Sequence, residues 1–327
     1  MTTTVDEIDA LQREINTASR TLLNAEPGEI NAIRTGNHKV RAGAGGQYFT
    51  TWDTAHGMLR DWACCGLYPL LRLAESNETG LMPAQLLEFW QATAYKYSTY
   101  LGYSGFDTLH SFERRAYAVC AAQPDRDTII AMLREIVRYA NLLTAWSHHY
   151  FPWGVGAGMR YAEASDEPSG AAVSTTRLTS TDVPSDIDGP RIEITWEPLG
   201  IRAEAVLATS LNPELVEEFV SALPFTILQE HALVSGESMF AWTPLVSTAP
   251  VRHTELISDA PIGRLRFSQN SGQKFIVQYG TTTENLAAPV LGQIIPEHRA
   301  GLAAVGEAAW SNTLDRREDI WVSVRLV

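Results

Sequence analysis

The sequence predicts an α+β protein with an N-terminal α-helical bundle and a C-terminal antiparallel β-barrel. Three observations lead to this fold class. Apolar residues recur at helical spacing through roughly the first 160 residues, and after residue 190 they alternate with polar residues as in a strand. Between these parts lies a segment rich in Ser, Thr, Asp, Pro and Gly that has little to bury. We expect a bundle at residues 1–162, a linker or long mobile surface loop at 163–190, and a barrel at 191–327.

The composition limits the class of protein. A chain of 327 residues suits two domains, and 45% hydrophobic with 9% aromatic residues is typical of a protein with a core. The N-terminus lacks the basic start and apolar run of a signal peptide, and no stretch approaches the ~18 apolar residues of a membrane span. A cytoplasmic location is therefore expected. The net charge of −13 argues against nucleic acid as a partner and requires local Arg, Lys or His to hold any anionic ligand.

Five helices are expected in the first part. The clearest is the fifth, whose apolar residues step by four, three, four and three, as in a buried stripe of a bundle. These residues are Ile129, Leu133, Ile136, Ala140 and Leu143. The other helices are expected from a capping box at Thr4 and Glu7, from Thr51 to Ala74, after Pro83, and from Asp107 to Ala121.

Alternating residues in the second part predict about eight strands. They fall at 192–196, 205–208, 226–234, 238–243, 263–268, 274–279, 291–295 and 320–326, with short helices after Asn212 and at 296–310. Because no βαβ unit repeats among them, the pattern favours a closed antiparallel barrel.

No cofactor is expected. The glycine-rich stretches at 43–46 and 154–158 begin like a dinucleotide-binding fingerprint, but Tyr48 and Met159 occupy the third glycine position and neither stretch follows a strand. The three cysteines, Cys64, Cys65 and Cys120, have no metal-ligand spacing.

The run from His148 to Trp153 ends the fifth helix and leaves two interpretations open. Polar and cationic side chains near a helix C-terminus are typical of a cap. The alternative is an aromatic wall at the mouth of a pocket between the domains. We favour the cap, and no further ligand stands at a spacing suited to zinc.

The segment from His231 to Trp242 is the strongest candidate for a site. Ser235-Gly236 predicts a two-residue hairpin turn, and alternation then places Ser238, Phe240 and Trp242 on one face of the return strand. An imidazole and nearby carboxylates beside flat apolar surface are what a small-molecule pocket needs. The competing interpretation is that these are rim residues of a barrel.

Basic residues recur on two further strands. Arg264 and Arg266 share one face of their strand, and Lys274 shares a face with Gln278, while Tyr279 lies on the opposite face. These side chains could clamp carboxylates, or they could form the solvated outside of a barrel.

Several separated motifs of residues 190–327 resemble a known family. The second half resembles bacterial cyclophilin-like barrel domains, and in particular cucumopine synthase and related Pictet–Spenglerases. A helical bundle accompanies the barrel in that family, which suits the first half, although no motif there matches residue by residue. The motifs are Leu223-Pro-Phe225, His231-Ala-x-x-Ser-Gly-Glu237, Trp242-x-Pro244, Pro261-x-Gly263-Arg-x-Arg266, Gln278-Tyr-Gly280 and Pro289-Val-Leu-Gly292.

The resemblance implies condensation of an aromatic amino acid with a 2-oxo acid. Cucumopine synthase joins histidine to 2-oxoglutarate, and related enzymes join tryptophan to 2-oxoglutarate to give a tetrahydro-β-carboline. Tryptophan is favoured here, with histidine next. Such a reaction needs neither nucleotide nor metal, which agrees with the absence of cofactor motifs.

This chemistry assigns roles to the candidate residues. Glu237 is expected to be the acid–base group, with His231 as its partner and Glu230 as the reserve candidate, so Glu237→Gln should slow product formation ~10²-fold. The substrate-binding residues are expected to be Phe240 and Trp242, which stack on the aromatic ring, Arg252, His253 and Lys274, which hold carboxylates, and Ser235, Ser238, Gln278 and Tyr279.

Two alternatives from other classes stay open: a non-catalytic protein that binds an aromatic metabolite, and, less favoured, a peptidyl-prolyl isomerase. The expected partners are small molecules, with neither nucleic acid nor membrane. The oligomeric state is left open, with a homodimer as one alternative, as are the amino acid and the product stereochemistry.

Overall fold

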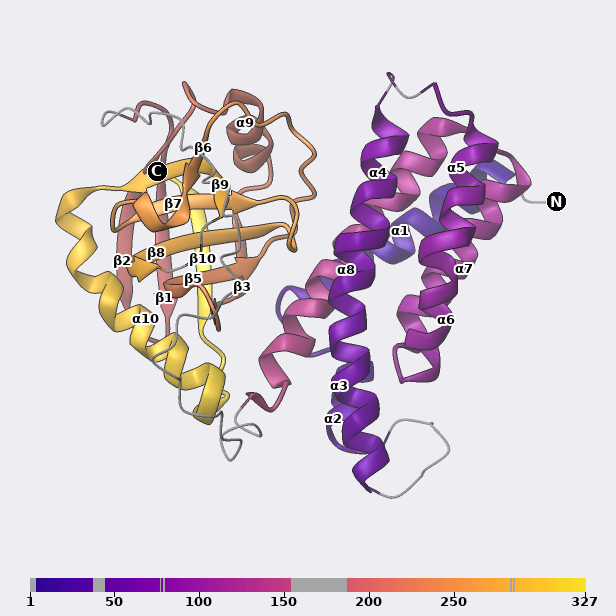
Figure 1. The fold of residues 1–327 in the computed structure, drawn as a ribbon, viewed down its shortest axis with the longest axis horizontal. Helices are drawn as coiled ribbons and strands as arrows, with labels where there is room; N and C mark the ends of the chain where they lie inside the picture. The colour runs from indigo at the N-terminus through magenta and orange to yellow at the C-terminus, as the bar shows by residue number, and fades with distance from the viewer. Residues whose placement is uncertain are drawn as a thin grey trace, which may run out of the picture.

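The structure, a computed structural model, describes residues 4–37, 45–76, 78, 80–153, 187–282, 284 and 286–327. Figure 1 shows a helical bundle on one side and a curled antiparallel sheet on the other, so the expected α+β class with these two parts is confirmed. Most of the expected linker, residues 163–186, lies outside the described residues. None of the described helices is both long and apolar enough to cross a membrane.

The bundle contains all five expected helices and one that the periodicity did not indicate. The additional helix, α2 (Gly28–Arg34), buries only Ile30 and Ile33 and is too short to show a repeat. Two expected helices are interrupted by π-helical turns, η1 and η3. The remaining elements are α1 (Thr4–Leu22), α3 (Gly45–Asp61), η1 (Trp62–Leu67), α4 (Tyr68–Glu75), α5 (Pro83–Trp90), η3 (Gln91–Tyr95), α6 (Lys96–Tyr103), α7 (Asp107–Ala122) and α8 (Arg126–Tyr150).

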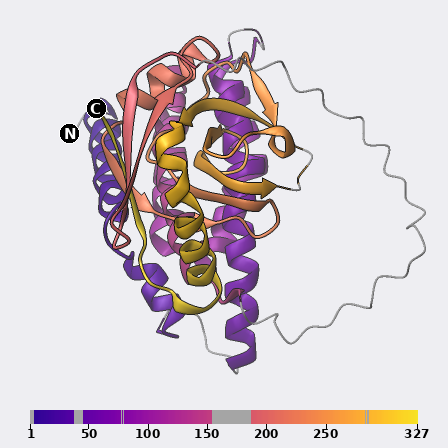
Figure 2. The ribbon, with the colours of Figure 1, turned by 90° about the vertical axis from the view of Figure 1, so that its left-hand side faces the viewer.

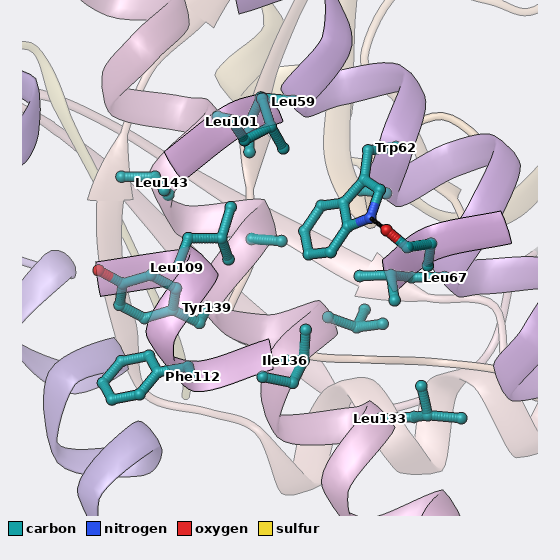
Figure 3. Packing of buried hydrophobic residues seen from close by; sticks show 14 of the residues in the cluster. Leu59, Trp62, Leu67, Leu101, Leu109, Phe112, Leu133, Ile136, Tyr139 and Leu143 are labelled. Carbon is teal, nitrogen blue, oxygen red and sulfur yellow. Dashed lines mark hydrogen bonds between the residues drawn. The ribbon is translucent and has the colours of Figure 1, made fainter. Parts of the chain in front are cut away.

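Helix α8 is the axis of the bundle. Asp125 caps its N-terminus by accepting a hydrogen bond from the Thr128 N–H, and the predicted stripe along the helix is buried. Figure 3 shows Leu133, Ile136 and Leu143 in the bundle core. From Tyr139 to His149 the helix is buried on every side, because β3 and β5 of the sheet pack against it. A helix that is buried all round lies between two bodies, which is the position of the C-terminal half of α8.

The sheet has ten antiparallel strands in the order β3-β10-β1-β2-β9-β7-β8-β5-β4, with β6 paired to β9. The expected strand at 226–234 is divided at Gln229 into β3, which pairs with β10, and β4, which pairs with β5. Because these two halves stand at opposite ends of the strand order, the sheet curls into a nearly closed barrel. The strands are β1 (Arg191–Glu197), β2 (Ile201–Leu207), β3 (Phe225–Leu228), β4 (Glu230–His231), β5 (Gly236–Trp242), β6 (Thr254–Leu256), β7 (Arg264–Ser268), β8 (Lys274–Thr282), β9 (Ala287–Ile294) and β10 (Trp321–Leu326).

Two helices complete the barrel. Both α9 (Pro213–Ser221) and α10 (Leu302–Ser311) contribute apolar side chains to its core, among them Phe219 and Val305. Figures 1 and 2 place α10 on the side of the barrel away from the bundle. Short turns η5 (Ile257–Asp259), η6 (Pro296–Gly301) and η7 (Asn312–Arg316) connect these elements. The bundle therefore covers the outer face of the barrel at β3 and β5, whereas α10 packs against side chains that face into the barrel.

Direct hydrogen bonds join the two parts. Two arginines of α8 donate to main-chain carbonyls of the segment after β5: Arg134 to Val246 at 2.9 Å and Arg138 to Pro244 at 3.0 Å. From the barrel side, Arg317 donates to the His149 carbonyl at 3.0 Å. These bonds fix the barrel face that carries β5 against the C-terminal half of α8.

Candidate functional site

The predicted alternation along the hairpin is confirmed. Met239 and Ala241 belong to the barrel core, so Ser238, Phe240 and Trp242 share the outer face of β5. Glu230 lies opposite Phe240 and His231 lies opposite Met239. Adjacent residues of β4 thus point to opposite faces, Glu230 outward and His231 inward.

The turn of this hairpin is longer than predicted. The Ala232 N–H donates to the Ser238 carbonyl, so the connection is wider than the two residues Ser235-Gly236. Gly236 has a φ of 86°, a conformation that favours glycine. The Ser235 hydroxyl donates to the Glu284 carboxylate at 2.6 Å and does not join the other candidate residues.

The neighbouring strand β8 extends the outer face. Lys274 lies opposite Trp242, and Gln278 lies opposite Ser238. The Lys274 Nζ atom is 4.4 Å from the centroid of the Phe240 ring and 4.7 Å from that of Trp242, distances typical of cation–π contacts. Gly272 leaves room for this arrangement, because a Cβ atom there would lie 2.5 Å from Trp242 Nε1 and 2.7 Å from Lys274 Cε.

The bundle adds further rings to this face. The His148 ring lies 5.6 Å from Phe240, 5.2 Å from Trp242 and 4.8 Å from Trp153, centroid to centroid. The interdomain aromatic cluster comprises His56, His148, Phe151, Trp153, Phe240 and Trp242.

Two features expected of the run from His148 to Trp153 are present, a cap and a set of rings toward the barrel, while a pocket between the domains stays a prediction. The Phe151 N–H and the Trp153 Nε1–H donate to the His148 carbonyl, which caps α8, and the rings of this run also form a wall toward the barrel.

The histidines of the interdomain aromatic cluster are neutral, and the charge next to the cluster is carried by Lys274. Burial lowers the pKa of His56 to about 3 and the pKa of His148 well below its ordinary value, so both imidazoles are neutral at pH 7. Burial also lowers the pKa of Lys274, to about 8. In the described part of the chain no carboxylate lies within ion-pair distance of Lys274.

A buried ion pair lies beside the cluster, and of its members only Glu230 was a candidate from the sequence. Glu230 Oε1 is 2.9 Å from His149 Nδ1, and both side chains are 1% exposed. Asp319 Oδ1 lies 3.2 Å from the other ring nitrogen of His149. Burial alone would lower the pKa of His149. The Glu230 and Asp319 carboxylates outweigh burial and raise the pKa to about 9. His149 is therefore an imidazolium at neutral pH. No sequence pattern pointed to Asp319, which is brought to this place by the chain before β10.

The His231 side chain faces into the barrel and contacts α10, not the bundle. His231 Nδ1 donates to the Ala232 carbonyl, and burial lowers the pKa of the ring, so in the neutral tautomer Nε2 accepts a 2.7 Å hydrogen bond from the Tyr279 hydroxyl. The Trp310 ring of α10 contacts His231 edge-on at 4.9 Å.

Glu237 lies at the same end of the barrel. Its carboxylate accepts a 2.6 Å hydrogen bond from the Thr281 N–H and covers Gly280, where a side chain would collide with it. Glu237, Gln278, Tyr279 and Glu307 line a cavity of about 560 Å³, which we call the barrel-end cavity. Two carboxylates and no Arg, Lys or His line it, so it is poorly suited to substrates that carry carboxylates.

The structure thus separates the candidate residues into two groups. The outer face toward the bundle holds Glu230, Ser238, Phe240, Trp242 and Lys274, while Glu237, His231 and Tyr279 lie by α10. Glu237 and Trp242 are five residue steps apart along β5, on the order of 16 Å along a strand. Gln278 reaches both groups, because it lies opposite Ser238 and also lines the barrel-end cavity.

Arg252 and His253 lie elsewhere, near α9. The Arg252 guanidinium pairs with the Glu214 carboxylate, and the backbone N–H groups of Arg252 and His253 donate to Asn212 Oδ1. The Arg252 guanidinium of the expected clamp is thus already paired with a carboxylate of the chain.

The two arginines of β7 are buried rather than solvated. Arg264 forms an ion pair with Glu255 at 2.8 Å. Arg266 is 1% exposed, and its Nε and Nη1 atoms have no hydrogen-bond partner among the described residues, while Nη2 lies 3.5 Å from Ser238 Oγ. Burial lowers the pKa of Arg266 to about 10.

Metal binding has no candidate within the described ranges, because no three His, Cys, Asp or Glu side chains there are grouped as ligands.

Comparison with known proteins gives one family match. Residues 8–150 match the family described as the cucumopine synthase C-terminal helical bundle domain. That description places the bundle after the rest of cucumopine synthase, whereas here it precedes the barrel. No curated protein matches the chain.

Two solved structures show partial likeness. McbB in complex with tryptophan is 34% identical over 41% of this chain, with a TM-score of 0.38. The match spans 44% of McbB, less than half of that chain. A hypothetical protein from Archaeoglobus fulgidus is 15% identical over 44% of this chain and 100% of its own, with a TM-score of 0.32. Both TM-scores are below 0.5, so neither likeness extends to the arrangement of the whole chain.

Proposed function

We propose that the chain is a Pictet–Spenglerase, because its residues 8–150 match the family described as the cucumopine synthase C-terminal helical bundle domain. The proposed reaction condenses an aromatic amino acid with a 2-oxo acid, without a cofactor. Tryptophan is the favoured amino acid, histidine is next, and 2-oxoglutarate is the favoured oxo acid. With tryptophan the product is a tetrahydro-β-carboline.

One observation carries this proposal. The last turn of α8, which ends the family-matched segment, contacts the barrel face that holds Phe240 and Trp242. The bundle that defines the family thereby helps to build the site. Ligand sites commonly lie between domains, where aromatic surface is combined with a few polar groups.

The side chains of this face suit the two substrates. We assign Phe240 and Trp242 to the aromatic ring of the amino acid and Lys274 to the carbonyl end of the oxo acid. The Gln278 Oε1 atom is buried and has no hydrogen-bond partner among the described residues. Holding both substrates on one face supplies the proximity that a two-substrate condensation needs.

Proton transfer is assigned to Glu230, the reserve candidate from the sequence. The reaction loses water to form an imine, the ring then attacks the iminium carbon, and a ring proton leaves. Glu230 shares the outer face with Phe240, and His149 orients its carboxylate. Glu237 and His231 remain an alternative acid–base pair at the barrel-end cavity.

The test is direct. The protein is incubated with each aromatic amino acid plus 2-oxoglutarate, and mass spectrometry is used to detect a product equal to both substrates less one water. We expect this product with tryptophan, and at least a ~10-fold lower rate for Trp242→Leu, which removes the stacking surface. Binding of tryptophan without consumption would contradict the proposal and favour the non-catalytic binding protein.

A further inference from the structure

Lys274 is an unusual lysine in this chain. The sequence has only three lysines, Lys39, Lys96 and Lys274, among 25 basic residues. The barrel half therefore uses arginine at every basic position except this one. Arginine stays protonated in proteins, whereas a lysine can lose its proton and act as a nucleophile.

The surroundings of Lys274 favour the free amine. The contacts of its Nζ atom with the Phe240 and Trp242 rings stabilise the ammonium form, but no described carboxylate is within ion-pair distance to add to that effect. The neighbouring His148 is neutral and supplies no counter-charge. Burial, the largest cause, and the positive charge of Arg60 lower the pKa of Lys274, against the opposing effects of Cys64 and Glu284. At pH 7 roughly a tenth of Lys274 is therefore unprotonated, far more than of an ordinary lysine.

Lys274 is also accessible to a ligand. The side chain is half-buried rather than enclosed, and Phe240 beside it is half-buried as well. An amine in an apolar setting, open to one side, is the arrangement that lysines use to form Schiff bases with carbonyl substrates.

We propose that Lys274 activates the 2-oxo acid by forming an imine between its Nζ atom and the ketone carbon, an inference that rests on the proposed function. The Nζ–C bond forms, and the carbonyl oxygen leaves as water after two proton transfers. The amino group of the aromatic amino acid then adds to the same carbon, and Nζ departs as the free amine. The lysine is regenerated, one water is released per product, and no oxidant or reductant is needed.

Reductive trapping tests the imine. The protein is incubated with 2-oxoglutarate and cyanoborohydride without amino acid, and is then digested and analysed by mass spectrometry. We expect Lys274 to gain one oxo acid plus two hydrogens less one water. Lys274→Arg keeps a cation but cannot form the imine, so it should give no adduct in that peptide and at least a ~10²-fold slower condensation. Lys96→Arg is the matched control and should retain both the adduct and the rate.

The outcomes separate this inference from the proposed function. Product formation by the wild type without an adduct on Lys274 would overturn the imine and leave the condensation standing. An adduct without product would support the imine and overturn the proposed function. Labelling only at Lys39 or the N-terminus would overturn the imine as well. Circular dichroism of both variants shows whether the substitutions preserve the fold.

Discussion

Glu230 and His231 are neighbours in sequence, yet they serve different surfaces of the barrel. The two-residue period of a strand directs Glu230 to His149 of the bundle and His231 to Tyr279 near α10. A sequence places both near the hairpin turn but does not say which one shares a face with the aromatic residues. The register Glu230 to Phe240 decides this.

The first prediction compares the two candidate acid–base carboxylates. Glu230→Gln should slow condensation ~10²-fold, because it removes proton transfer on the face that holds Phe240 and Trp242. Glu237→Gln should stay within about threefold of the wild-type rate, since its carboxylate lies at the barrel-end cavity. Single-turnover product formation measures both variants. The opposite order would place the chemistry in the barrel-end cavity and support the original assignment of Glu237 and His231.

The second prediction concerns Gly272, which has a φ of 128° and lies under the side chains of Trp242 and Lys274. Gly272→Ala should displace both side chains and slow condensation ~10-fold or more. Gly200→Ala is the control, because Gly200 also has a positive φ, of 67°, but faces open space. Equal losses of activity in the two variants would show that backbone strain, and not the position of Trp242 and Lys274, is responsible.

Among the helices and strands, those with a long regular repeat were predictable. The stripe on α8 and the alternation in β1, β5 and β8 follow from burial of one face. Shorter elements could not be predicted, because α2 buries only two residues and β6 is only three residues long. The break between β3 and β4 was also hidden, since Gln229 bonds across the corner through its side chain, to Trp196 and to the Phe240 carbonyl.

The third prediction concerns His149 at the end of α8 and the pH dependence of its contribution to stability. The pKa of His149 is about 9 in the folded protein, above the ~6.5 of an unfolded chain. The imidazolium therefore stabilises the native state fully below about pH 6.5, and this contribution, on the order of 3 kcal/mol, is lost as the pH rises through about 9. The difference in Tm between the wild type and His149→Gln should shrink between pH 6.5 and 9.5. A difference that stays constant or grows would contradict a charged His149.

The arrangement of the two domains explains why the site could be predicted only in part. Alternation placed Phe240 and Trp242 together, and the resemblance indicated a bundle beside the barrel. Neither could show which barrel face the bundle covers, because that depends on contacts more than 100 residues apart in sequence, such as Arg138 to Pro244. The same contacts bring His148 and His149 to the face that carries Lys274.

The fourth prediction tests whether these contacts matter for activity. Arg134→Ala with Arg138→Ala removes three hydrogen bonds from α8 to the barrel and should slow condensation ~10-fold, because the substrate-binding face loses its alignment. Arg13→Ala with Arg20→Ala, two exposed residues of α1, is the matched control and should leave the rate unchanged. Steady-state kinetics on both double variants provide the measurement. A similar rate in all three proteins would show that the bundle does not shape the site.

The most direct test is a crystal structure of the protein with bound tryptophan. We predict that the indole lies against Phe240 and Trp242, within reach of Lys274 and beside His148 of the bundle. A tryptophan bound instead in the barrel-end cavity, beside Glu237 and Tyr279, would contradict the interdomain site and the roles assigned to Lys274 and Glu230.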